Sequence, residues 1–232
     1  MKRLAIITAR GGSKRIPRKN ILPFLGQPIL AYSIKAALES KMFDEVMVST
    51  EDGEIASIAK EYGAKVPFLR SPETSNDFAG TADVLMEVLN EYKKLGKQFD
   101  TMCCIYPTAP FVTADKLSDA VLKLENSEAD TLIPVVRFSY PPQRALVQKD
   151  GLLTFKYPEY LNSRSQDLEP HFHDAGQFYI VKVNQFMVNR ELMIGSILPY
   201  ELSELEVQDI DNMSDWKIAE IKYQSMLDGK EE

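Results

Sequence analysis

The stretch LAIITARGGSKRIPRKN, residues 4–20, decides the fold of this chain. It starts as an apolar, β-prone run and then breaks into a loop that contains two adjacent glycines and five cationic side chains. The cations are Arg10, Lys14, Arg15, Arg18 and Lys19. A continuous apolar run is typical of a central parallel strand, and open α/β sheets bind ligands where such strands end. We therefore expect a ligand site at this loop, and its charge indicates an anion.

The composition is that of a globular protein with an acidic balance. Of the 232 residues, 44% are hydrophobic and 26% are charged, and the net charge is -7. This length suits one sizeable α/β domain, and the charge argues against a nucleic-acid-binding protein. The sequence contains no membrane-spanning run, and its first apolar run is too short for a signal peptide. Cys103 and Cys104 are adjacent in an apolar run, which favours buried thiols in a reducing, cytoplasmic compartment.

Strand-like and helix-like segments alternate over the first part of the chain. We expect strands at residues 4–8, 45–49, 65–69, 101–106 and 131–137, and helices at 29–40, 53–62, 81–95 and 113–126. Thr81 is the expected N-cap of its helix. Later segments predict strands at 176–182 and 206–210, a helix at 215–227 capped by Asn212 or Ser214, and a frayed tail over 228–232. The alternation predicts an α/β fold with a doubly wound, mostly parallel sheet.

Residues 138–172 interrupt this alternation. They contain Tyr140-Pro-Pro142, Tyr157-Pro158 and Glu169-Pro170 and show little periodicity, apart from a short strand expected at 152–156. A loop this long inside a domain is usually functional or part of an interface. We therefore expect one domain over residues 1–232 with an inserted, projecting arm at 138–172. Its tyrosine and phenylalanine residues suit a contact between subunits.

The cationic loop fits neither of two common phosphate-binding patterns. It lacks the Gly-x-x-x-x-Gly-Lys-Ser/Thr of P-loop ATPases and kinases and the Gly-x-Gly-x-x-Gly of dinucleotide-binding folds. Arginine can clamp a phosphate with two donors, lysine acts as a point charge, and the Gly-Gly-Ser run offers backbone N–H groups. This mixture predicts a polyphosphate site. A solvated surface loop is the alternative, and the position directly after the first strand argues against it.

The sequence Arg10-Gly-Gly-Ser-Lys14, followed by Pro17 and Lys19-Asn20, resembles the loop of the cytidylyltransferases that activate nonulosonic (sialic-type) acids. Further elements of that family are similar to Leu69-Arg-Ser-Pro72, Pro107-Thr-Ala-Pro110 and Asp209-Ile-Asp211, so the resemblance covers nearly the whole chain. It implies the Rossmann-like fold of nucleotide-diphospho-sugar transferases and a homodimer in which the arm reaches the neighbouring subunit.

Two segments are most similar to the pseudaminic acid branch of this family. They are Tyr140-Pro-Pro-Gln-Arg-Ala-Leu146 and His173-Asp-Ala-Gly-Gln-Phe-Tyr179, and Tyr106 stands where the sialic-acid enzymes carry Gln. The resemblance implies nucleotidyl transfer from CTP to a nine-carbon 2-keto-3-deoxy sugar acid, with release of pyrophosphate, in flagellin or surface-glycan modification. Legionaminic and N-acetylneuraminic acids are the alternative substrates. A non-catalytic nucleotide-binding regulator is a different class, disfavoured by the complete set of expected site residues.

The expected site residues fall into four groups. Arg10, Lys19 and Asp211 are the expected catalytic residues, which stabilise charge on the transferred and leaving phosphates. Asp209 and Asp211, two residues apart on an expected strand, would share one face and bind Mg²⁺. The nucleotide is expected to contact Ala9, Arg10, Gly12, Ser13, Lys14, Asn20, Arg70, Ala79, Thr81, Pro107 and Thr108. The sugar acid is expected to contact Tyr106, Arg144, Arg164, His173, Gln177 and Tyr179.

Overall fold

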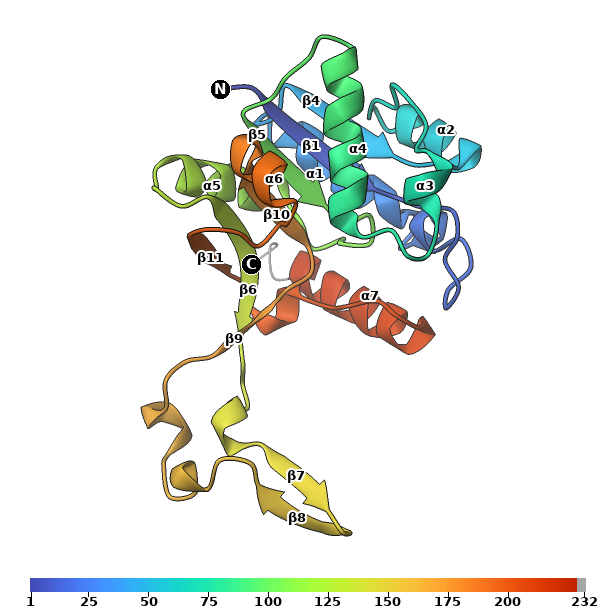
Figure 1. Cartoon of the computed structure of the whole chain (residues 1–232). Helices are drawn as coiled ribbons and strands as arrows, with labels where there is room; N and C mark the ends of the chain where they lie inside the picture. The colour runs from blue at the N-terminus through green and yellow to red at the C-terminus, as the bar shows by residue number, and fades with distance from the viewer. Residues whose placement is uncertain (229–232) are drawn as a thin grey trace.

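A mixed, mostly parallel sheet forms the centre of the computed structural model, which describes residues 1–228. Within these residues the sheet has seven strands in the order β11-β6-β10-β5-β1-β4, with β9 beside β6 (Figure 1). Their bounds are β1 Arg3–Thr8, β4 Glu45–Ser49, β5 Thr101–Ile105, β6 Thr131–Arg137, β9 Phe172–Asp174, β10 Phe178–Lys182 and β11 Ile197–Glu201. β1 is parallel to β4 and β5, and β6 is parallel to β11, whereas β10 runs antiparallel to β5 and β6.

Helices cover both faces of this sheet (Figure 1). α1 (Ile29–Glu39), α2 (Gly53–Glu61) and α5 (Ala114–Glu125) pack on one face, and α4 (Thr81–Lys94) and α6 (Val183–Asn189) pack on the other. Alternate strand residues supply the two layers, so the buried, free thiols of Cys103 and Cys104 lie in different layers. The doubly wound α/β fold predicted from the sequence is therefore confirmed.

The last described helix, α7 (Met213–Asp228), packs against the loop that follows β1. Its Trp216 is buried with Ile16 of that loop. Asn212 caps the helix as predicted, because its Oδ1 accepts hydrogen bonds from the backbone N–H groups of Ser214 and Asp215 at 2.8 and 3.1 Å. The apolar contact between Trp216 and Ile16 thus fixes the cationic loop against α7. The fraying expected over residues 228–232 falls on residues that, after Asp228, lie outside the described part.

Three details of the predicted secondary structure are wrong. Residues 65–69 form no strand, because after an isolated bridge between Lys65 and Met47 the chain meets Pro67, which has no N–H to donate. Residues 206–210 form no strand either, and the last strand of the sheet in chain order is β11. The N-cap of α4 is Gly80 rather than Thr81, and its N–H is held by the Asp83 carboxylate at 2.9 Å.

An arm projects away from the sheet (Figure 1). The chain leaves through β6 and returns through its antiparallel partner β9, with Arg137 opposite Phe172. The arm carries a hairpin of β7 (Leu146–Lys149) and β8 (Leu152–Phe155), in agreement with the strand predicted at 152–156. Asp150 and Gly151 both have positive φ, as the tight turn of a hairpin requires.

Short elements complete the described chain. They are β2 (Pro23–Phe24), β3 (Gln27–Pro28) and α3 (Pro72–Ser75), together with single 3₁₀ turns. None of the helices within residues 1–228 has the length and apolar character needed to cross a bilayer.

Candidate active site

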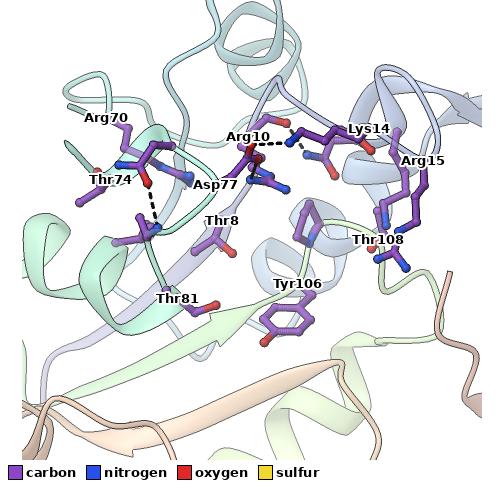
Figure 2. Close-up of a pocket in the computed structure, with 18 residues that line it drawn as sticks. Thr8, Arg10, Lys14, Arg15, Arg70, Thr74, Asp77, Thr81, Tyr106 and Thr108 are labelled. Atoms are coloured by element: carbon purple, nitrogen blue, oxygen red, sulfur yellow. Dashed lines mark hydrogen bonds and ion pairs between the residues drawn. The ribbon is translucent and has the colours of Figure 1, made fainter. Parts of the chain in front are cut away.

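A cavity of about 540 Å³ opens at the carboxyl ends of β1 and β5 (Figure 2). Its walls come from the loop after β1, the turn after β5 and the segment that leads into α4. Most of the predicted nucleotide set lines it: Arg10, Ser13, Lys14, Asn20, Arg70, Ala79, Thr81, Pro107 and Thr108. Ala9 and Gly12 do not line it, and Ala9 is fully buried beneath the loop. The sequence thus predicted segments that the fold brings to one place.

Local contacts fix the backbone of the cationic loop. The N–H of Gly11 donates to Glu51 Oε1 at 2.7 Å, and Asn20 Nδ2 donates to the carbonyl of Arg10 at 2.8 Å, which ties the two ends of the loop together. A Cβ atom at Gly11 would lie 2.6 Å from a carboxylate oxygen of Asp52. Glycine at this position therefore lets the loop lie directly against the start of α2.

Asp77 forms ion pairs with two cations of the loop (Figure 2). Its carboxylate lies 3.1 Å from Arg10 Nη1 and 2.6 Å from Lys14 Nζ. The hydrogen bond from Lys14 lowers the pKa of Asp77, and the charges of Lys14 and Arg10 add to this effect. An anion of the protein itself is therefore bound by the cations that were predicted to bind phosphate. Asp77 was not among the predicted site residues, because its pairing with this loop leaves no local sequence signal.

Arg18 anchors the loop to α2 instead of facing the cavity. Its guanidinium pairs with Asp52 and Glu54, and Asp52 also accepts from the N–H groups of Glu54 and Ile55 at 2.9 and 3.0 Å. The Arg18 hydrogen bond is the main cause that lowers the pKa of Asp52 to about 2. Arg18 therefore has a structural role, in which it joins the loop to the start of α2.

Lys19 connects the cavity with the segment that carries the two predicted metal ligands. It lines the cavity, and its Nζ donates to the carbonyl of Ile210 at 2.6 Å. Burial lowers the pKa of Lys19, while the charges of Asp211 and Asp209 act in the opposite direction. Arg15 Nη2 lies 2.6 Å from Asp211 Oδ1. The predicted catalytic residues Lys19 and Asp211 therefore lie in one neighbourhood, with Arg10 on the cavity wall.

Arg70 is a buried arginine in the cavity wall. It is 8% exposed, and its guanidinium donates to the carbonyl and the hydroxyl of Ser49 at 2.6 and 3.1 Å. Burial lowers its pKa, and the nearby carboxylates of Glu51 and Glu87 oppose this. Arg70 is therefore a fixed part of the cavity wall and not an exposed surface side chain.

Residues 4–197 match the family model described as cytidylyltransferase, which is most of the chain. The chain belongs to the cytidylyltransferase family.

Two curated relatives match this chain over nearly the full length of both proteins. The pseudaminic acid cytidylyltransferase of Campylobacter jejuni is 39% identical over 96% of this cytidylyltransferase and 97% of its own length. The CMP-N,N'-diacetyllegionaminic acid synthase of Legionella pneumophila is 31% identical over 95% of each chain. The solved CMP:2-keto-3-deoxy-manno-octonic acid synthetase superposes with a TM-score of 0.72 at 16% identity over 97% of this chain and 100% of that one. That last likeness establishes the shared fold, as predicted.

The predicted sugar contacts of this cytidylyltransferase divide into two groups. Tyr106 lines the cavity, with its ring centre 5.4 Å from that of Tyr179. Gln177 and Tyr179 are both about 3% exposed and lie behind the cavity wall, where the Tyr179 hydroxyl donates to Asp174 Oδ2 at 2.6 Å. Their contact with a sugar stays a prediction. The signal that sequence reasoning lacked was their burial.

The other predicted sugar contacts lie in or beside the arm. Arg144 donates to the carbonyl of Ser163 at 3.4 Å, and Arg164 pairs with Asp167 at 3.0 Å. His173 packs on Phe138 with ring centres 5.0 Å apart. None of these side chains lines the cavity in the described chain.

Asp209 and Asp211 flank the buried Ile210, but not on a strand, so the same-face argument for them is wrong. No group of three or more His, Cys, Asp or Glu side chains with metal-binding geometry occurs within residues 1–228. Mg²⁺ in nucleotide sites is usually held by one or two carboxylates, with phosphate oxygens and water as further ligands. The carboxylate of Asp209 has no hydrogen-bond or ion-pair partner among these residues. The pair therefore fits the chemistry of a nucleotide-bound Mg²⁺.

Proposed function

We propose that the chain transfers CMP from CTP to pseudaminic acid and releases pyrophosphate. The observation that carries this proposal is the cation-lined cavity at the end of β1, where Arg10, Lys14 and Lys19 meet. The identity with the Campylobacter jejuni relative supports the choice of sugar acid. The product would serve the modification of flagellin or surface glycans, and the free thiols of Cys103 and Cys104 suit a cytoplasmic enzyme.

The proposed reaction is one displacement at phosphorus. The anomeric hydroxyl oxygen of the sugar acid forms a bond to the α-phosphorus of CTP and gives up its proton to solvent. The bond from that phosphorus to the bridging oxygen of the β-phosphate breaks, and pyrophosphate leaves with the electron pair of that bond. Arg10 and Lys14 exchange Asp77 for the leaving phosphates, and Lys19 lies beside them. Cations that are already in place when charge develops lower the barrier of such reactions.

Mg²⁺ is part of this proposal, and Asp209 and Asp211 are the residues that would hold it. When bound, the ion would neutralise charge on the phosphates. The protein's own contribution is to hold the two carboxylates on either side of the buried Ile210.

We also propose that the arm at 138–172 joins two copies of the chain as a homodimer. The hairpin exposes Leu152 and Leu153 by 71% and 66%, an apolar surface suited to burial against another molecule. A second copy would bring Arg144, Arg164 and His173 toward the cavity of its neighbour. Light scattering in solution tests this, and a monomer at micromolar concentration contradicts it.

A substrate panel tests the proposed reaction. The protein is incubated with CTP and Mg²⁺ together with pseudaminic, legionaminic or N-acetylneuraminic acid, and pyrophosphate release is followed. We expect the fastest release with pseudaminic acid. Turnover of another acid in its place overturns the choice of substrate, and no turnover of any acid with normal CTP binding favours a regulator. ATP turnover without preference for CTP would favour a different class of enzyme.

The charge of Lys19 is tested by Lys19→Met. Because this side chain lies between the cavity and the Asp209–Asp211 segment, we expect kcat to fall by about 100-fold or more. Lys60→Met on the exposed side of α2 is the matched control and should retain full activity. Similar losses in the two variants would contradict the role of Lys19.

A further inference from the structure

The segment that carries Asp209 and Asp211 has an unusual backbone. Residues 207–210 form neither helix nor strand, and within the described chain they take part in no backbone–backbone hydrogen bond. A free segment of this kind would sample many conformations. Two carboxylates that must meet one cation need a fixed backbone, so other groups must hold it.

Two lysine side chains hold this segment through its carbonyl oxygens. Lys222 of α7 donates from Nζ to the carbonyls of Glu204 and Val207 at 3.1 and 2.7 Å. Lys19 donates to the carbonyl of Ile210 at 2.6 Å from the opposite end. Lys222 forms no salt bridge with a carboxylate within residues 1–228, so its ammonium group serves the two carbonyls.

A buried glutamine holds the residue directly before this segment. Gln177, about 3% exposed, donates from Nε2 to the carbonyl of Glu206 at 2.6 Å. Its own backbone carbonyl accepts from the N–H of Tyr106 at 2.9 Å, at the cavity rim. Gln177 thereby connects the end of β5 with the segment that carries the two aspartates.

The far end of the segment is fixed by α7. Asp215 Oδ2 accepts from the N–H groups of Asp211 and Asn212 at 2.9 and 3.0 Å. Ile210, between the two aspartates, is buried against α7 and the cationic loop. A shift of residues 204–208 would therefore be felt at Asp209 first, since Asp211 has its own anchor.

We propose that Lys222 and Gln177 are positioning residues that set Asp209, together with Asp211, for a divalent cation bound with the nucleotide. The proposal rests on the proposed function. Neither side chain lines the cavity, so each acts through the backbone that it holds. Partners that orient metal ligands typically contribute about 10- to 100-fold to metal affinity or activity.

Lys222→Met is the principal test, because this side chain is only half-buried and its loss leaves the core intact. The dissociation constant of CTP is measured by calorimetry with Mg²⁺ and again with EDTA. The constant in EDTA divided by the constant with Mg²⁺ reports how strongly the metal supports nucleotide binding. We expect Lys222→Met to reduce this ratio about tenfold, to leave CTP binding in EDTA unchanged, and to lower kcat with pseudaminic acid.

Three further variants sharpen the test. Lys222→Arg keeps donors for the two carbonyls and should restore most of the ratio. Lys217→Met removes an exposed lysine from the same helix and should match the parent. Gln177→Leu should act as Lys222→Met does, with circular dichroism to establish that it is folded.

An unchanged ratio in folded Lys222→Met overturns the proposal, and so does a parent protein whose CTP binding is indifferent to Mg²⁺. An equal loss of CTP binding in EDTA also overturns it, because that would indicate a general structural role. Failure of the proposed function is a separate result: no sugar acid is then turned over, although the metal-dependent binding of CTP is still measured.

Discussion

At the scale of single residues, Asp77 is the most informative position. It lies 67 residues from Arg10 in sequence, yet its carboxylate is bound by Arg10 and Lys14. A triphosphate that uses these cations must displace it. The free protein therefore starts with its phosphate-binding cations already ordered around an internal anion, and the ligand competes with that anion.

Asp77→Asn should bind CTP and pyrophosphate about fivefold more tightly than the parent protein. The reason is that two exposed ion pairs, each of modest strength, no longer compete with the phosphates. Glu73→Gln is the matched control, since it removes the same charge from an exposed nearby position. Calorimetry checks both variants. A gain in Glu73→Gln as large as that in Asp77→Asn would mean that only long-range charge matters.

At the scale of elements, the start of α2 shows how a helix terminus holds a functional loop. Asp52 caps the helix and also binds Arg18, so the loop and the helix share one carboxylate. Because the folded-state pKa of Asp52 is lowered from 3.8 to about 2, its contribution to stability is present above about pH 4 and is lost as the pH falls toward 2.

Asp52→Asn keeps a capping oxygen but removes the charge. We expect the free energy of unfolding to fall by about 1 kcal/mol at neutral pH, allowing for solvent screening of the partly exposed pair. The difference from the parent should shrink between about pH 4 and pH 2. Urea unfolding at several pH values measures it. Asp115→Asn in the first turn of α5 is the control, and a pH-independent difference for Asp52→Asn would contradict the argument.

The same scale shows what the sequence could predict. The strands at 45–49 and 131–137 were predicted with the observed bounds, because they are apolar runs buried on both faces. β11 was missed because it is an edge strand with alternating exposure and contains Pro199. Residues 206–210 looked like a strand, but the carbonyls of Glu206, Val207 and Ile210 are bound by side chains distant in sequence. Such long-range pairs, like that of Asp77 with Arg10, leave no local pattern.

At the scale of the whole molecule, the chain forms two parts, the projecting arm and the domain that carries the cavity. The chain leaves the sheet after β6, returns through β9, and then enters the sheet again as β10 between β5 and β6. At the base of the arm, the N–H of Phe138 donates to the carbonyl of His171 at 2.9 Å. The two ends of the arm are therefore as close as paired strands allow.

Replacement of residues 139–170 by Asn-Gly should convert β6 and β9 into a simple hairpin, because this dipeptide favours a tight turn between paired strands. We expect a folded protein that binds CTP like the parent, since the cavity is built from other residues. Dimerisation and use of the sugar acid should be lost. Thermal unfolding, light scattering and CTP calorimetry check this, and failure to bind CTP would contradict the independence of the two parts.

The narrow base of the arm also bears on how such enzymes diversify. A segment whose ends lie side by side can be exchanged between related chains as a cassette, with no new register imposed on the sheet. Under the proposed role of the arm, recombination at positions 138 and 171 would alter the sugar preference and leave the residues that line the nucleotide cavity unchanged. A graft of the corresponding segment from the Legionella pneumophila relative, assayed with both acids, would reveal whether selectivity travels with it.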